Sequence, residues 1–162
     1  MSTLAIRPIE PYQVTDVKWG DYGEEASMTF KKGAVLVEDS SSKELEEWAG
    51  GTDSAIPVGI AVSNASQTAG TRCGYYEAND ANLFSATLRN GTDAIAQAAS
   101  HINGEYSLVY DSTTSSWCVD VADGTTKLVQ VLRVASDATA GDTNCRVVIR
   151  FLTDKRAKSA AA

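Results

Sequence analysis

Two stretches of the chain, about seventy residues apart, carry nearly the same pattern of residues. Residues 63–77 and 134–149 each pass through Thr-Ala-Gly, reach a cysteine and continue into an apolar run. Five landmark pairs recur 69 to 72 positions apart: Gly33 and Gly104, Asp39 and Asp111, Trp48 and Trp117, Gly70 and Gly141, Cys73 and Cys145. The pattern indicates either a structural duplication or the turn residues that β-hairpins reuse everywhere. It is not a solenoid, which needs three or more repeats.

Short apolar runs separated by Gly, Asn, Asp, Ser and Thr make up most of the chain after Met28. This pattern predicts a mainly β fold. A tryptophan ahead of a glycine-rich turn typically covers a β layer, although a ligand-stacking role for either repeated tryptophan stays open. From the alternation of the runs we predict these core residues: Trp48, Val58, Ile60, Trp117, Val147, Ile149 and Phe151.

One segment has the composition of a helix. Residues 93–103 (DAIAQAASHIN) are rich in alanine, Thr92 or Asp93 is a suitable N-cap, and Gly104 is a suitable stop. We therefore expect one short helix from Asp93 to Asn103 in an otherwise β-rich protein.

Residues 1–27 have the character of an extended arm. Two prolines bias their neighbours toward extended conformations, and the spaced apolar residues form no helical face. The entropy cost of ordering such an arm nearly cancels what its few apolar side chains gain. We therefore expect it to be mobile in the free protein and to order on a partner. The residues expected to contact that partner are Ile6, Pro8, Ile9, Pro11, Tyr12, Val14, Val17 and Trp19.

Composition and motifs exclude several classes of function. The formal net charge is −7, which argues against nucleic-acid binding, and no apolar run reaches the ~20 residues of a membrane helix. One histidine, three cysteines without a Cys-x-x-Cys pair, and no phosphate-binding loop leave no recognisable set for catalysis, a metal or a cofactor. We expect no enzyme activity, no small-molecule substrate, buried reduced thiols, and folding in a cytoplasm.

The block from Ala34 to Val62 carries a specific resemblance. An apolar strand leads to Asp39-Ser40-Ser41, a short charged strand ends at Trp48, and Gly51-Thr52-Asp53 precedes Pro57-Val58-Gly59-Ile60. This order resembles the head decoration proteins of lambda-type tailed bacteriophages. The likeness is good over these 29 residues and loose over the rest of residues 28–110.

The resemblance implies a β-tulip-like fold, a small β-barrel or sandwich, in a structural virion protein. Such a protein is made in the host cytoplasm and binds the major capsid protein on the outer capsid surface. It does so as a homotrimer, and it stabilises the expanded head. On this basis we expect an arm at 1–27, a decoration-protein-like β domain at 28–111, additional β strands on the same domain at 112–154, and a flexible tail at 155–162. The alternatives are another β-rich phage component, such as a head fibre or tail part, and a carbohydrate-binding β module.

Overall fold

The fold is mainly β, as the sequence predicts. The computed structural model describes residues 1–19, 22–50, 55–123 and 126–152, so the expected tail at 155–162 lies outside the described residues. The elements, in chain order, are β1 (Glu10–Gln13), β2 (Val35–Glu38), β3 (Leu45–Glu47), β4 (Pro57–Ala61), β5 (Tyr75–Glu77), β6 (Leu83–Asn90), β7 (Asp93–Ala94), the 3-10 helix η1 (Ala99–His101), β8 (Glu105–Asp111), β9 (Ser116–Asp120), β10 (Val129–Val134) and β11 (Arg146–Phe151).

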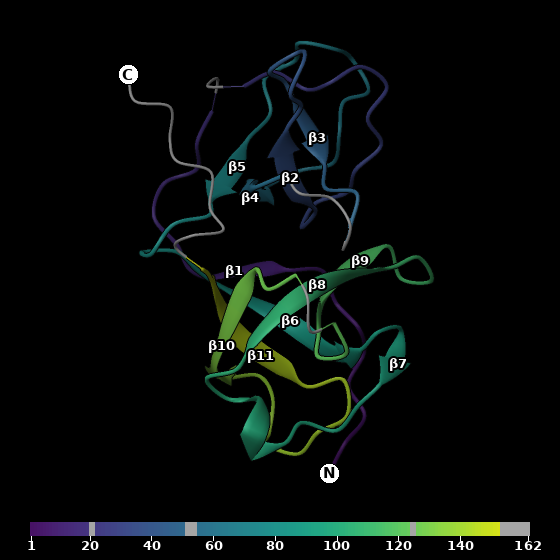
Figure 1. Cartoon of the computed structure of the whole chain (residues 1–162), viewed down its shortest axis with the longest axis vertical. Helices are drawn as coiled ribbons and strands as arrows, with labels where there is room; N and C mark the ends of the chain where they lie inside the picture. Colours follow the sequence, from purple (N-terminus) through teal and green to yellow (C-terminus); the bar gives the residue numbers. More distant parts are fainter. Residues whose placement is uncertain (20–21, 51–54, 124–125, 153–162) are drawn as a thin grey trace.

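The strands form two sheets with the same internal order. The first sheet runs β3-β2-β4-β5, and the second contains the path β9-β8-β10-β11. In both, the first strand along the chain lies between the second and the third, and every neighbour along these two paths pairs antiparallel. In Figure 1 the first set forms the upper part of the molecule and the second set the lower part. The near-repeat in the sequence is therefore a structural duplication.

Residue pairing follows the duplication in detail. Leu36 pairs with Gly59 as Tyr106 pairs with Val129, so both partners are shifted by 70 positions. In the neighbouring hairpins Leu36 pairs with Glu47 and Leu108 with Val119, a shift of 72. Relative to β2, β8 therefore carries an insertion of two residues between its two ladders. Because side chains alternate with a period of two, an insertion of two residues leaves every core-facing side chain on its original face.

The first hairpin turns are also copies of each other. The Oδ1 atom of Asp39 accepts hydrogen bonds from the backbone N–H groups of the residues two and three positions later, at 2.8 Å each. Asp111 does the same at 2.9 and 3.3 Å. Each turn then passes through a residue with positive φ, Lys43 (63°) or Ser115 (53°). An aspartate at the start of each loop fixes the turn through its own side chain.

Each set of four strands is closed into a barrel by one further segment that pairs with both of its outer strands. Strand β6 pairs antiparallel with β11 and, at Leu88, parallel with β9. In the first set, Lys18 forms an antiparallel bridge with Tyr75 of β5, and Glu24 forms a parallel bridge with Leu45 of β3. The later part of the arm predicted at 1–27 therefore closes the first barrel through these bridges. We call residues 18–77 barrel 1 and residues 83–151 barrel 2.

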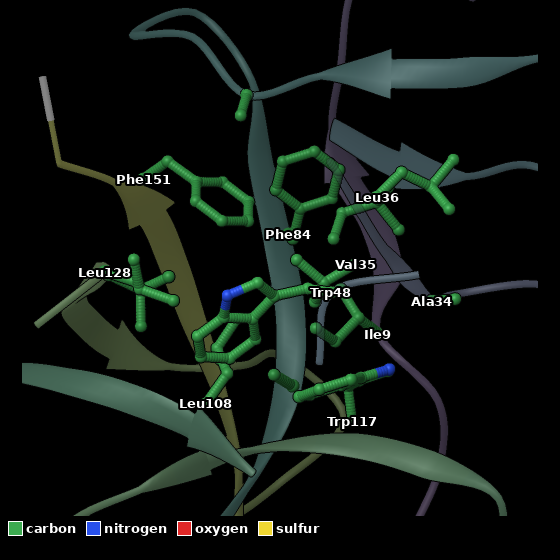
Figure 2. Close-up of a cluster of buried hydrophobic side chains, with 14 of the residues drawn as sticks. Ile9, Ala34, Val35, Leu36, Trp48, Phe84, Leu108, Trp117, Leu128 and Phe151 are labelled. Carbon is green, nitrogen blue, oxygen red and sulfur yellow. The ribbon is translucent and has the colours of Figure 1, made fainter. Parts of the chain in front are cut away.

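The two barrels share one hydrophobic core. A single cluster joins buried side chains from both, and Figure 2 shows its centre. Trp48 of barrel 1 packs on Trp117 of barrel 2 with ring centroids 5.3 Å apart, and Phe84 packs on Phe151 at 5.9 Å. All seven residues predicted for the core are less than 10% exposed: Trp48, Val58, Ile60, Trp117, Val147, Ile149 and Phe151. The two tryptophans are not equivalent positions, because the pairing register aligns Trp117 with Leu45.

The helix expected over residues 93–103 is wrong. That segment contains the two-residue strand β7 and the single turn η1. Its backbone is hydrogen-bonded to the loop before β11: Gln97 N–H donates to Asp142 O, and Asn144 N–H donates to Ile95 O. These long-range hydrogen bonds satisfy backbone groups that a helix would have satisfied locally, so tertiary structure overrides the helical propensity of the alanines.

The division expected at residue 111 falls within a hairpin. Residues 111 and 116 are the last pair of the β8–β9 ladder. The strands after residue 111 complete a second barrel that begins at β6, so they are neither an extension of barrel 1 nor separate from β8.

Removing the side chain at the barrel junction should destabilise the whole molecule. We predict that Trp48→Ala lowers the free energy of unfolding by about 3–5 kcal/mol, because the cavity left by a fully buried indole is not refilled. Trp19→Ala is the matched control, since Trp19 is 57% exposed and Trp48 only 1%. Urea unfolding followed by circular dichroism measures both. A loss below about 1 kcal/mol in Trp48→Ala would contradict the shared core.

Candidate partner-binding surface

The N-terminal arm lies along barrel 2 before it enters barrel 1. Near its start, Ser2 N–H donates to Asp142 Oδ1 at 2.8 Å, and Leu4 N–H donates to Thr143 O at 2.9 Å. The amide of Asn144 donates in turn to Leu4 O at 3.1 Å. These bonds join the first residues of the chain to the loop before β11 in barrel 2, although the arm leads directly into barrel 1.

A buried arginine holds the middle of the arm. Arg146 is 1% exposed, and its Nη1 donates to Pro8 O at 3.3 Å. Its Nη2 donates to Glu10 Oε2 at 3.3 Å and to both oxygens of Ser85 on β6. Burial lowers the pKa of the Arg146 guanidinium, and the Glu10 carboxylate opposes that effect. A charge this deeply buried needs partners, and the arm supplies two of them.

A second arginine completes a four-residue charge network. Arg7 donates to Glu10 at 2.7 Å and to Asp137 at 2.8 Å, and both contacts are largely exposed. The hydrogen bond to the Glu10 carboxylate, together with the negative charge of that carboxylate, raises the pKa of Arg7. Exposed ion pairs contribute little on their own, so the buried contacts of Arg146 matter most for retaining the arm.

The arm is ordered on its own domain, so the expectation that it orders only on a partner is wrong. Strand β1 pairs antiparallel with β6, from Glu10 opposite Ser85 to Gln13 opposite Leu83. Ile9 is 2% exposed and belongs to the shared core. The estimate from side-chain burial omitted the backbone hydrogen bonds that an extended segment gains when it adds to a sheet edge.

The eight predicted contact residues are not equally available to a partner. Ile9 is buried, and Ile6, Pro8, Val14 and Val17 are partly buried. Pro11, Tyr12 and Trp19 remain exposed, Tyr12 at 37% and Trp19 at 57%. We define Pro11, Tyr12 and Trp19 as the exposed arm surface.

Local contacts fix the two aromatic rings of this surface. The Arg133 guanidinium lies 5.4 Å from the centre of the Tyr12 ring, a cation–π contact. Hydrogen bonds with Ser136 and Arg133 lower the pKa of the Tyr12 hydroxyl. The indole of Trp19 lies against Gly74, where an added Cβ would come within 2.6 Å of the ring. Glycine is therefore needed at position 74 for the Trp19 ring to lie where it does.

The single histidine has a structural role. Its Nδ1 accepts a hydrogen bond from the Ala98 N–H at 3.0 Å, and burial lowers its pKa. The structure holds no group of three or more possible metal ligands within its described ranges. Cys73, Cys118 and Cys145 are buried free thiols, and burial raises their pKa values to about 11, 12 and 11.

Neither repeated tryptophan presents a face to solvent. Trp48 is 1% and Trp117 is 4% exposed, and the Trp117 Nε1–H donates to Glu47 at 2.8 Å. A carbohydrate-binding platform built on these two indoles is therefore excluded. The Tyr110 ring also packs on Trp117, with ring centroids 5.5 Å apart.

No family model, curated protein or solved structure matched this chain. Among the described residues no helix has the length and apolar character needed to cross a membrane.

Loss of the Glu10 carboxylate should loosen the arm. We predict that Glu10→Ala lowers the free energy of unfolding by about 1–3 kcal/mol, because Arg146 stays buried with fewer acceptors. NMR order parameters of residues 3–7 should fall from about 0.85 to below about 0.6. Glu38→Ala is the control, since it removes an exposed pair with Lys43 at 3.7 Å. An arm that stays rigid in Glu10→Ala would show that the charge network does not hold it.

Proposed function

We propose that this chain is a structural virion protein that binds the outer surface of a bacteriophage capsid and stabilises the expanded head. The proposal is carried by the block from Ala34 to Val62. Its apolar strand, charged strand and Val-Gly-Ile strand are β2, β3 and β4, which are hydrogen-bonded neighbours in barrel 1. The lambda-type resemblance therefore falls on one continuous piece of β structure. The Gly51-Thr52-Asp53 turn of the block lies outside the described residues.

The position of the exposed arm surface supports the proposal. Tyr12 and Trp19 follow the segment that Arg146 holds, and each ring is fixed by a neighbour rather than free. Aromatic side chains dominate the energetic centres of protein interfaces, and fixed rings lose little entropy on binding. In this proposal the partner is the major capsid protein, and three copies of the chain assemble on it as a homotrimer.

The duplication changes what one copy can cover. A single chain carries two barrels joined by one core, so each bound chain presents a rigid body of both barrels rather than one. Such a body resists expansion forces without a hinge between its halves. Its role is mechanical, and its site of action is the outside of the virion.

Binding to capsids tests the proposal directly. Purified chain mixed with expanded, undecorated heads should pellet with them and raise the temperature at which they rupture. Replacing both Tyr12 and Trp19 by alanine should weaken pelleting at least about thirtyfold, since the loss of even one interface hot spot costs about 2 kcal/mol or more. Tyr110→Ala is the matched control, an aromatic residue with 40% exposure that lies outside the arm.

The two parts of the proposal fail differently. If the unaltered chain does not bind heads, the proposed function is wrong. If the double variant binds as well as the unaltered chain, the capsid contact lies elsewhere than the exposed arm surface.

A further inference from the structure

A polar depression lies at one end of barrel 2, apart from the exposed arm surface. Its volume is about 420 Å³, within the roughly 300–1,000 Å³ typical of small-ligand sites. Most of its wall consists of hydroxyl and charged side chains from the β6–β7 turn and the β8–β9 turn. The lining residues are Ile6, Arg89, Thr92, Asp111, Ser112, Thr113 and Thr114.

Arg89 is held in one orientation with a donor to spare. It is only 6% exposed, its Nε donates to Asp93 O at 2.9 Å, and its Nη1 donates to Asp111 Oδ2 at 3.0 Å. Its Nη2 makes no hydrogen bond within the described part of the chain. The only buried side-chain atoms there without a partner are Asn144 Oδ1 and Arg146 Nε. Nη2 is therefore accessible to solvent, on the residue that lines the depression.

Acceptors and further donors line the same depression as Arg89. Asp111 uses Oδ1 for the turn and has one bond at Oδ2, so a lone pair remains there. The side-chain hydroxyls of Thr92, Ser112, Thr113 and Thr114 make no hydrogen bonds to described residues. The depression thus offers a fixed donor, a fixed acceptor and four free hydroxyls in one place.

The charges select the class of ligand. The Arg89 guanidinium is already balanced by Asp111 at 3.0 Å, and the chain carries a formal net charge of −7. An anion would therefore gain little from Arg89 and would be repelled by Asp111. A neutral ligand with several hydroxyl groups can accept from Nη2 and donate to the carboxylate at once. Ile6 adds one apolar wall on which the C–H face of a sugar ring can pack.

We infer that this depression binds a neutral polyhydroxy ligand, a single saccharide unit being the best fit. It is open and has only one apolar wall, so the affinity is weak, with a dissociation constant on the order of 1 mM. The inference does not rest on the proposed capsid function. It assigns a glycan contact to barrel 2 that leaves Trp48 and Trp117 buried.

The duplicated turn in barrel 1 provides an internal control. There the hydroxyls of Ser41 and Ser42 are already bonded to Asp39, and Ser42 also bonds to Glu25. No arginine is bonded to Asp39 within the described residues. The same backbone turn is therefore present without the arginine donor and with two of its three serine hydroxyls already bonded.

NMR titration of the full chain with methyl glycosides of glucose, galactose and mannose tests the inference. Backbone amide signals of residues 89–92 and 111–114 should shift saturably, while those of residues 39–42 should not. Replacing Thr92 and Thr113 together by valine should raise the dissociation constant at least about tenfold, because each loses a hydroxyl and keeps its backbone N–H. Ser40→Ala, the exposed serine of the control turn, should bind like the unaltered chain.

Several results would overturn the inference. These are no saturable shift with any of the three glycosides, equal shifts in both turns, or unchanged binding in the double valine variant. Acetate or phosphate that shifts the same amides more strongly than the glycosides would instead assign the depression to anions.

Discussion

The structure depends on two segments, each of which pairs with both outer strands of a four-stranded set. Strand β6 pairs antiparallel with β11 and parallel with β9, and in barrel 1 the bridges of Lys18 and Glu24 join β5 and β3 in the same two orientations. Without that double pairing each set of four strands would be an open sheet with two exposed edges, which are prone to pair with other chains. Closure also encloses the core, because the inward side chains of a small barrel fill its interior.

Closure alone would give two separate small barrels, and the shared core makes them one body. Trp48 and Trp117 meet where the barrels touch, and Ile9 of the arm joins the same cluster. The arm then crosses from barrel 2 to barrel 1, held by Arg146 before it closes barrel 1. The buried charge therefore links the two barrels. Arg146 belongs to β11 of barrel 2, and its acceptors Pro8 and Glu10 belong to the chain that leads into barrel 1.

The sequence predicted those features that repeat locally. Period-two alternation predicted the buried side chains of Val147, Ile149 and Phe151, although most of the opposite face of β11 is buried as well. Asp39 and Asp111 marked equivalent turns because an aspartate side chain fixes such a turn by itself. The closing role of Lys18 and Glu24 was missed because their bridges resemble the pairing of β6 while the residues around them do not resemble β6. The helix over residues 93–103 was wrong because its backbone partners lie near Asp142, far along the chain.

The candidate sites show the same difference between features that the local sequence encodes and features that depend on distant contacts. Tyr12 and Trp19 are recognisable from sequence as aromatic residues in an apolar arm, but their exposure depends on how that arm folds back. Ile9 is another apolar residue of the same arm, yet its side chain is buried. The depression in barrel 2 could not be anticipated from the sequence. It requires Arg89 of β6 to contact Asp111 of β8 and Ile6 of the arm to lie beside them. No local pattern encodes a contact between such distant residues.

The central claim is that two copies of one barrel form a single cooperative unit, and native-state hydrogen exchange tests it most directly. Ala61 N–H donates to Ala34 O in barrel 1, and Val131 N–H donates to Gly104 O in barrel 2, the same bond 70 positions later. With increasing denaturant, both amides should exchange through one global opening, with free energies that agree within about 0.5 kcal/mol. Two separate openings, with one barrel losing protection while the other keeps it, would contradict the claim.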